Sequence, residues 1–89
     1  MTSNYNVQFS KEALRYFSKL DRKKKEKLAS VIDALKENPF LLPNVKPLQG
    51  LPYDMYLVRV GDLRIIYRLE NEKLLILILK IGSRGDIYK

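Results

Sequence analysis

Hydrophobic and polar residues along the first part of the chain follow patterns typical of one strand and two helices. Residues 5–9 alternate with period two, which predicts a half-buried strand. Apolar residues then recur at helical spacing from Lys11 to Leu20, after Ser10 as a candidate N-cap. A second helix is predicted over residues 22–37, following Asp21, whose carboxylate can accept hydrogen bonds from free backbone amides.

The rest of the chain predicts an irregular connection and then three strands. Pro39 disfavours helical geometry at the residue before it and so ends the second helix. Further prolines and a glycine indicate irregular structure up to Asp54. The strands are expected at Tyr56–Val60, Leu63–Leu69 and Leu74–Ile81. The last strand is nearly all Leu and Ile, so we expect it to be central and covered on both faces.

These elements predict an α+β fold in a single domain over residues 1–89. The order is β-α-α-β-β-β, with a small antiparallel or mixed sheet and an N-terminal helical hairpin on one face. Because two helices can cover only one side of such a sheet, the other side is available for function.

Gly61-Asp62 suits a two-residue hairpin turn between two of these strands. If these residues form the loop, Arg59 lies directly opposite Arg64 and both project from one sheet face. The rest of that face is Leu57, Ile66 and Arg68, and the opposite face is apolar enough to pack against the helices. Like charges directly opposite each other destabilise a ladder, by roughly 0.2–1 kcal/mol. The pair therefore indicates an anion-binding site.

Composition narrows the possible partners and chemistry. The net charge is +7, from 17 Lys and Arg against 10 Asp and Glu. Such a basic domain favours nucleic acid or the ribosome surface, although the charge could serve solubility alone. The chain has no cysteine and no histidine, which excludes disulfides, zinc–thiolate sites and Ser–His or Cys–His nucleophile pairs. It has no signal-peptide pattern and no apolar run that could cross a bilayer, so we expect a cytoplasmic protein with no membrane partner.

The candidate catalytic residues are Arg59, Arg64, Arg84 and Tyr88. Two glycines near the C-terminus allow that segment to turn sharply, which would bring Arg84 and Tyr88 beside the arginine pair. Guanidinium groups bind phosphate bidentately and would stabilise charge developing on phosphorus, while Tyr88 is better suited to move a proton. Without histidine or a metal cage, such a site would rely on RNA's own 2′-hydroxyl. We therefore expect an RNA substrate, no metal and no cofactor.

Each candidate also has a purely structural interpretation. Arg59 and Arg64 could be solvated residues on an open sheet face, and Tyr88 lies one residue from the end, where disorder is common. Arg68 could contact RNA or be an ordinary surface cation. A run of cations at the start of the second helix could bind an RNA backbone or could simply be the solvent-exposed face of that helix. Its members are Arg22, Lys23, Lys24, Lys25 and Lys27.

An ordered series of motifs resembles the RelE/ParE superfamily of toxin–antitoxin toxins, in its RelE-like branch. The series is Phe9-Ser10-x-x-Ala13, Pro39, PLQGLP, YLVRVGDLRIIYRL and IGSRGDIY, and it covers nearly the whole chain. The resemblance implies a toxin that enters the ribosomal A site and cleaves the mRNA there, leaving 2′,3′-cyclic phosphate and 5′-hydroxyl ends. It also implies a cognate, RelB-like antitoxin as partner.

The resemblance further implies individual roles. Arg64 matches an arginine that binds the scissile phosphate, and Arg84 one that stabilises the transition state or protonates the leaving group. Tyr88 matches a tyrosine that orients or activates the nucleophile. Arg59 and Leu57 stand where the family's best-studied site has lysines. An arginine keeps the charge but is a poorer proton acceptor, so the proton route is expected to differ or the activity to be slower.

Two alternatives stay open on the sequence. One is a ParE-type toxin, which shares the fold but inhibits DNA gyrase without cutting RNA. The other is a member that binds RNA or ribosomes without chemistry, which Leu57 keeps possible.

Overall fold

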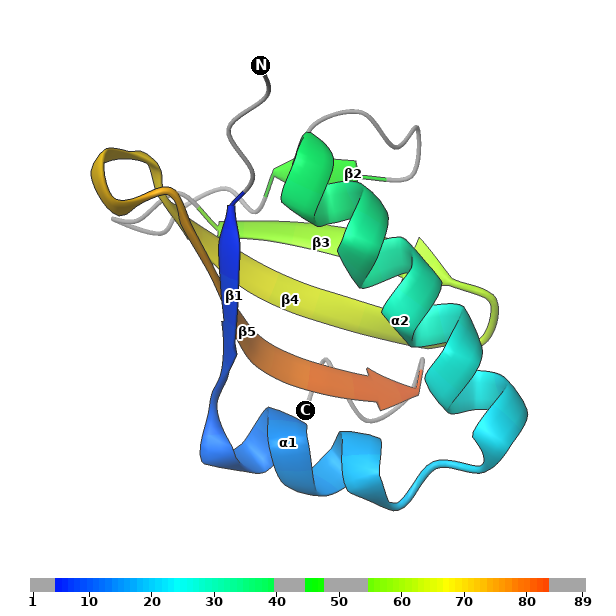
Figure 1. The fold of residues 1–89 in the computed structure, drawn as a ribbon. Helices are drawn as coiled ribbons and strands as arrows, with labels where there is room; N and C mark the ends of the chain where they lie inside the picture. Colours follow the sequence, from blue (N-terminus) through cyan, green and yellow to red (C-terminus); the bar gives the residue numbers. More distant parts are fainter. Residues whose placement is uncertain (1–4, 40–44, 48–54, 84–89) are drawn as a thin grey trace.

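The structure is a computed structural model, and it describes residues 5–39, 45–47 and 55–83. The chain begins with a strand, β1, and two helices, and the remaining elements are strands and a short 3-10 turn, η1 (Figure 1). In order they are β1 (Asn6–Phe9), α1 (Lys11–Ser18), α2 (Arg22–Glu37), β2 (Val45–Pro47), β3 (Met55–Val60), β4 (Leu63–Glu70), η1 (Asn71–Lys73) and β5 (Leu75–Ser83).

The strands form one mixed sheet in the order β1-β5-β4-β3-β2. β1 pairs with β5 in parallel, and the other three pairings are antiparallel. This confirms the predicted α+β class. The short edge strand β2 was expected to be irregular, so that part of the prediction is wrong. Its three residues end in a proline and acquire strand geometry only by pairing with β3, for example Val45 with Val58.

Both helices begin at the predicted caps. The Ser10 side chain accepts a hydrogen bond from the Ala13 amide, and Asp21 accepts one from the Lys24 amide. α2 ends at Asn38, whose extended backbone is the geometry that a following proline imposes. The helices meet at residues 19–21 and diverge from there, with α1 along β5 and α2 across β3 and β4 (Figure 1).

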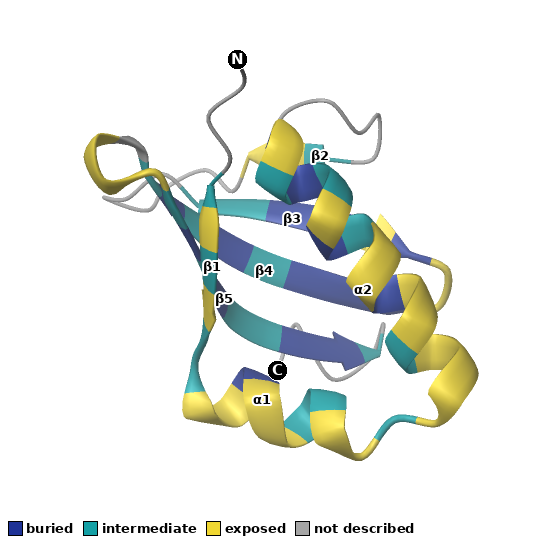
Figure 2. Cartoon of the chain, in the orientation of Figure 1, coloured by how far each residue is buried: buried dark blue, intermediate teal, exposed yellow. Residues whose placement is uncertain are grey.

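The core lies between the helices and one face of the sheet (Figure 2). That face is the predicted one: Val58, Val60, Ile65 and Tyr67 are all buried in a cluster that includes residues of α1 and α2. β5 is an inner strand as expected, but of its Leu and Ile side chains only the isoleucines are buried. The leucines of this strand are half-buried, namely Leu75, Leu77 and Leu79. The prediction that both faces of the strand are covered is therefore wrong.

Tyr67 ties the centre of the sheet to the segment after α2. Its ring stacks on Tyr56 at 5.7 Å between centroids, and its hydroxyl donates a buried hydrogen bond of 2.9 Å to the Pro39 carbonyl. Burial, with a smaller contribution from Tyr56, raises the pKa of the Tyr67 hydroxyl above its ordinary value. The folded chain therefore holds this proton more tightly than the unfolded chain does.

Replacing Tyr67 by Phe should lower the free energy of unfolding by about 1–2 kcal/mol at neutral pH, because the Pro39 carbonyl loses its donor in the core. Urea denaturation measures this loss. Tyr16→Phe is the control, since that side chain is only half-buried, and it should change stability much less.

The same variant, Tyr67→Phe, also tests whether the pKa of the Tyr67 hydroxyl is raised in the folded protein. The unfolded chain loses its tyrosine proton near about pH 10, where folded Tyr67 still keeps it. The raised pKa of Tyr67 therefore makes its full contribution to the free energy of unfolding below about pH 10. Above that pH, this contribution should fall by about 1.4 kcal/mol per pH unit. Tyr67→Phe should lack this component, and identical slopes for the two proteins in alkaline urea titrations would contradict the assignment.

Candidate nucleic-acid interface

The β3–β4 hairpin places Arg59 opposite Arg64, as the sequence predicts. Gly61 and Asp62 form the turn, and Gly61 has φ +61°, a left-handed conformation that favours glycine. Val60 pairs with Leu63 next to the turn, which fixes the register of the arginines. Side chains opposed in this way start about 4.5–5.5 Å apart at their Cβ atoms. The two arginine side chains therefore begin close together on one face of the sheet.

The two arginines differ in their contact with water. Arg59 is exposed, whereas Arg64 is only 7% exposed and is the one buried charged residue among those the structure describes. A buried charge is screened less by salt than an exposed one. Arg64 therefore brings a fixed positive charge to the middle of the sheet, and Arg59 brings a second one that solvent reaches.

Besides the arginine pair, this face carries Arg68, Lys80 and the exposed Lys46 of β2, which is opposite Leu57. Arg68 and Lys80 each have an acidic partner. Arg68 Nη2 lies 2.6 Å from Glu70 Oε1, so the charge of this predicted RNA-binding residue is partly balanced. Lys80 of β5 pairs across the ladder with Ile66 and lies 3.8 Å from Glu12 of α1. The sequence analysis missed Lys80, because simple alternation along β5 would turn it toward the core.

Arg84 and Tyr88 lie outside the described residues. Their approach to Arg59 and Arg64 stays a prediction, as do the catalytic roles of all four. β5 is described as far as Ser83, and its Gly82 lies directly opposite Arg64.

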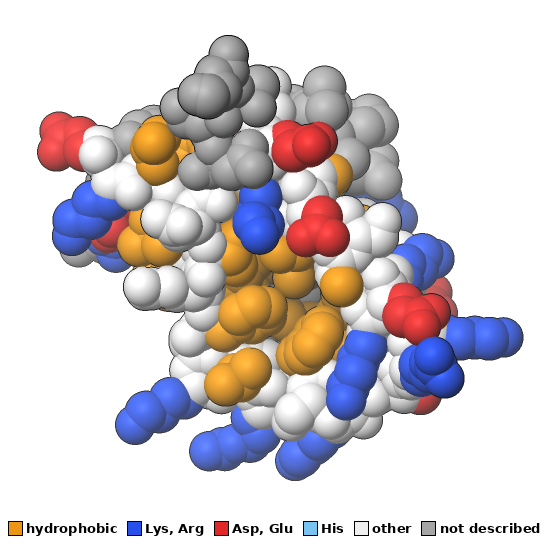
Figure 3. All heavy atoms as spheres, in the orientation of Figure 1, with side chains coloured by type: hydrophobic (Ala, Val, Ile, Leu, Met, Phe, Trp, Pro, Cys, Tyr) orange, Lys and Arg blue, Asp and Glu red, His pale blue; other side chains and the backbone are white. Residues whose placement is uncertain are grey.

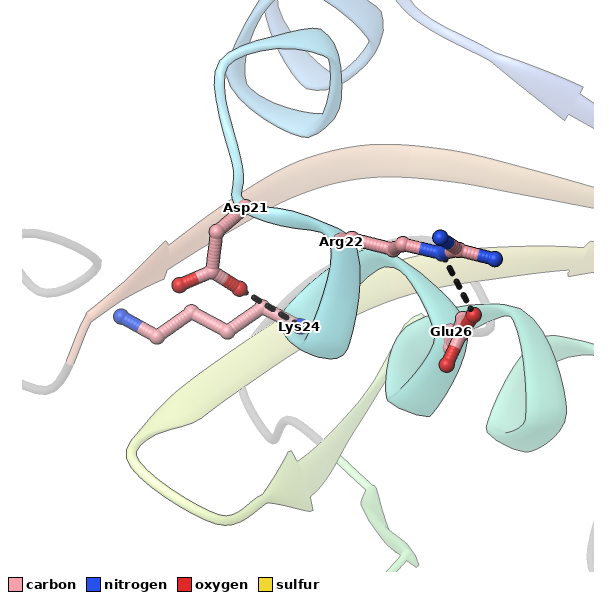
Figure 4. A network of polar contacts seen from close by, with 4 residues as sticks. All are labelled: Asp21, Arg22, Lys24 and Glu26. Atoms are coloured by element: carbon pink, nitrogen blue, oxygen red, sulfur yellow. Dashed lines mark hydrogen bonds and ion pairs between the residues drawn. The ribbon is translucent and has the colours of Figure 1, made fainter.

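The predicted cationic run opens α2 (Figure 4). Arg22 Nε lies 3.2 Å from Glu26 Oε2, a pair that is largely exposed and adds little stability. Lys24 extends on the other side, away from that pair (Figure 4). Lys23, Lys24 and Lys27 are exposed and Lys25 is half-buried, so the run is available to a polyanion. Blue side chains stand out around α1 and the start of α2 in Figure 3.

A cleft of about 310 Å³ separates the start of α2 from the β3–β4 turn. Lys24 and Lys27 line one wall, and residues 60–63 line the other. A methyl group added at Gly61 would lie 3.0 Å from Lys27 Nζ, so this ammonium sits directly over the turn. This cleft is on the helix side of the hairpin, away from Arg59 and Arg64. The turn consequently carries cations on both sides, with Asp62 in the cleft wall as an opposing charge.

The described residues can also be compared with the requirements of a membrane span and of a metal site. None of their helices is long and apolar enough to span a membrane. They contain no group of three or more His, Cys, Asp or Glu side chains arranged to hold a metal ion.

Comparison with known proteins gives a consistent assignment. Residues 7–88 match the sequence model of the family described as "ParE toxin of type II toxin-antitoxin system, parDE". A putative RelE-like toxin protein of Escherichia coli is 31% identical over 88 residues, which cover 94% of this chain and 90% of that protein. The putative toxin RelE1 of Methanocaldococcus jannaschii is 31% identical over 87 residues, with 96% of each chain covered.

The fold points the same way. The archaeal RelE–RelB complex of Pyrococcus horikoshii OT3 contains a chain that superposes with a TM-score of 0.82 at 28% identity, covering 93% of this chain and 98% of that one. The superposition covers almost all of both chains. This protein therefore belongs to the RelE/ParE superfamily of type II toxin–antitoxin toxins, in its RelE-like branch.

Proposed function

We propose that this toxin stops translation by cleaving messenger RNA in the ribosomal A site. The observation that carries the proposal is the opposed pair Arg59 and Arg64 on the sheet face that points away from the helices. Two like charges at this spacing are unfavourable by themselves, and a bound phosphate group between them turns repulsion into two attractive contacts. We infer the dependence on the ribosome from the similarity to RelE toxins.

In the proposed reaction the 2′-oxygen of RNA attacks the adjacent phosphorus and the bond to the 5′-oxygen breaks. The 2′-hydroxyl gives up its proton, the 5′-oxygen gains one, and the products are a 2′,3′-cyclic phosphate and a 5′-hydroxyl. Arg64 stabilises the extra negative charge on the phosphate oxygens, since its buried charge is weakly screened. We assign the proton transfers to Tyr88 and Arg84, and phosphate binding to Arg59.

The lysines of the α2 cleft extend this surface beyond the reacting phosphate. Lys24 and Lys27 flank the hairpin turn from the helix side, while Arg59 precedes the turn on the other. A polynucleotide that passes around the turn would meet positive charge on both sides of it. We propose that the cleft binds ribosomal or messenger RNA backbone through phosphate contacts.

We also propose a RelB-like antitoxin as partner. The Pyrococcus horikoshii relative was solved as a RelE–RelB complex. In this chain, apolar side chains are visible between α1 and α2 (Figure 3), and those that the core leaves half-buried on these helices and their joint include Tyr16, Phe17, Leu20 and Val31. An antitoxin segment that covers this surface would bury apolar area and restrain the toxin.

Inhibition of DNA gyrase is the second candidate function, because the matching family model carries the ParE name. The cationic surface on both sides of the hairpin favours RNA over this alternative. A third outcome, RNA or ribosome binding without chemistry, corresponds to Leu57 standing where a lysine acts in related sites.

Replacing Arg64 by Ala should reduce the rate of message cleavage about 10²–10³-fold, because one donor to the transition state is lost. Arg84→Ala should behave likewise, and each variant should relieve growth arrest. Mapping of mRNA ends in cells and on purified, programmed ribosomes measures the effect. Arg15→Ala, which removes an exposed cation from α1, is the control and should stay toxic.

Because Arg64 is buried, thermal denaturation must accompany this experiment to separate loss of fold from loss of chemistry. Full toxicity of both folded variants would refute the site. Cuts confined to translated codons support the first candidate, gyrase-dependent DNA breaks the second, and neither of these the third.

Changing Lys24 and Lys27 to Gln should weaken ribosome binding and make it less sensitive to salt. Each lost phosphate contact should reduce the slope of log affinity against log salt by about 0.7. Sedimentation of toxin with ribosomes over a salt series measures this slope. Lys73→Gln removes the same charge at the opposite end of the sheet (Figure 1) and should leave the slope unchanged. If the Lys24, Lys27 and Lys73 variants all reduce the salt slope equally, the cleft does not bind RNA preferentially.

Co-expression with the product of the neighbouring open reading frame should yield a tight, non-toxic complex. Hydrogen exchange of the purified complex should show new protection over α1 and α2, where the half-buried apolar residues lie. A toxin that purifies alone, or a complex in which protection avoids both helices, would contradict the proposed antitoxin surface.

A further inference from the structure

β5 contains a bulge whose effect is to change the direction of one lysine. In the pairing with β4, Tyr67 is opposite Ile78 and Ile66 is opposite Lys80, which leaves Leu79 as an extra residue. An inserted residue of this kind reverses the alternation of every side chain that follows it. Ile76 and Ile78 face the core before the bulge, so an unbroken strand would place Lys80 in the core beside them.

The bulge is held in place by Ser10. The Ser10 hydroxyl donates a 2.7 Å hydrogen bond to the Leu79 carbonyl while it also caps α1, and its amide donates to the Ile78 carbonyl at 2.9 Å. The carbonyl of the extra residue, Leu79, thus has a hydrogen-bond donor. After the bulge, Ile81 returns to the core with 2% of its surface exposed, and Lys80 joins the face of Arg64.

Lys80 lies close to the arginine pair on that face. Arg59, Arg64 and Gly82 form one row across three strands, and Leu57, Ile66 and Lys80 form the next. Lys80 is therefore the diagonal neighbour of Arg64, about 7–8 Å away between backbones. Gly82 has no side chain to stand between them. Successive phosphate groups of an RNA strand can bridge a spacing of this order when the lysine side chain extends.

The present partner of Lys80 holds it weakly. The distance from Lys80 Nζ to Glu12 Oε2 is 3.8 Å, and the two side chains keep 35% and 66% of their surface exposed. Pairs that are this long and this open to water contribute little. A phosphate group, which offers several charged oxygens to one ammonium, can displace such a carboxylate.

We propose that Lys80 is a third cation of the anion site, which leaves Glu12 and binds the RNA phosphate next to the one held by Arg59 and Arg64. This inference rests on the proposed function, because it takes the ligand to be an RNA backbone. Lys80 secures the strand rather than the reacting group, so its loss weakens RNA binding and leaves the cleavage rate at saturation unchanged.

The test measures binding of a fluorescent single-stranded oligonucleotide, 2′-O-methylated so that cleavage cannot occur, to the free protein by anisotropy over a salt series. Lys80→Met should weaken binding about tenfold and reduce the salt slope by about 0.7. Glu12→Gln, which removes the competing carboxylate, should bind more tightly than the unaltered protein.

Lys73→Met is the matched control, because Lys73 also pairs with a carboxylate, at 3.9 Å from Glu70 Oε2, and its loss changes net charge equally. It should bind like the unaltered protein. Equal losses for the two lysine variants, no loss for Lys80→Met, or no gain for Glu12→Gln would each overturn the inference. Failure of the unaltered protein to cut message on ribosomes would instead refute the proposed function, since the binding assay needs neither ribosome nor cleavage.

Discussion

The register of the β3–β4 hairpin is the constraint on which the rest of this molecule depends. Side chains along a strand alternate between two faces, so a slip of one residue would move Arg59 and Arg64 into the core and the core residues to the outside. The turn at Gly61 and Asp62 prevents that slip, because the left-handed backbone of Gly61 fits this position of a two-residue loop. One turn thereby fixes both the hydrophobic core and the arginine pair.

The two faces of the sheet differ in the side chains that they carry. The helix side holds the apolar core, with Tyr67, Ile65 and the isoleucines of β5 at its centre. The opposite side carries Arg59, Arg64, Arg68 and Lys80 in the same strands. Because the cations share a backbone with the most buried residues, the core fixes where their side chains begin. The proposed phosphate ligand would therefore meet these cations in positions set before it binds.

Much of this could be predicted from local patterns. Alternation at residues 5–9, the caps Ser10 and Asp21, and the stop before Pro39 depend on neighbours within a few residues, and the structure has each of them. β2 could not be predicted, because Val45–Pro47 becomes a strand only through its pairing with β3. The half-exposure of the β5 leucines could not be predicted either, because an apolar run does not show whether a second layer covers the strand.

The sequence by itself determined that Arg59 and Arg64 oppose each other, because a two-residue turn leaves no other pairing for the residues beside it. It also carried the likeness to RelE-like toxins in its ordered motifs. Only the tertiary structure decided that Arg64 is buried while Arg59 is not, and that Lys80 belongs to their face. The place of Lys80 depends on a contact between distant segments. The carbonyl of the extra residue Leu79 accepts a hydrogen bond from Ser10, which is 69 residues earlier in the chain, and no local pattern encodes that contact.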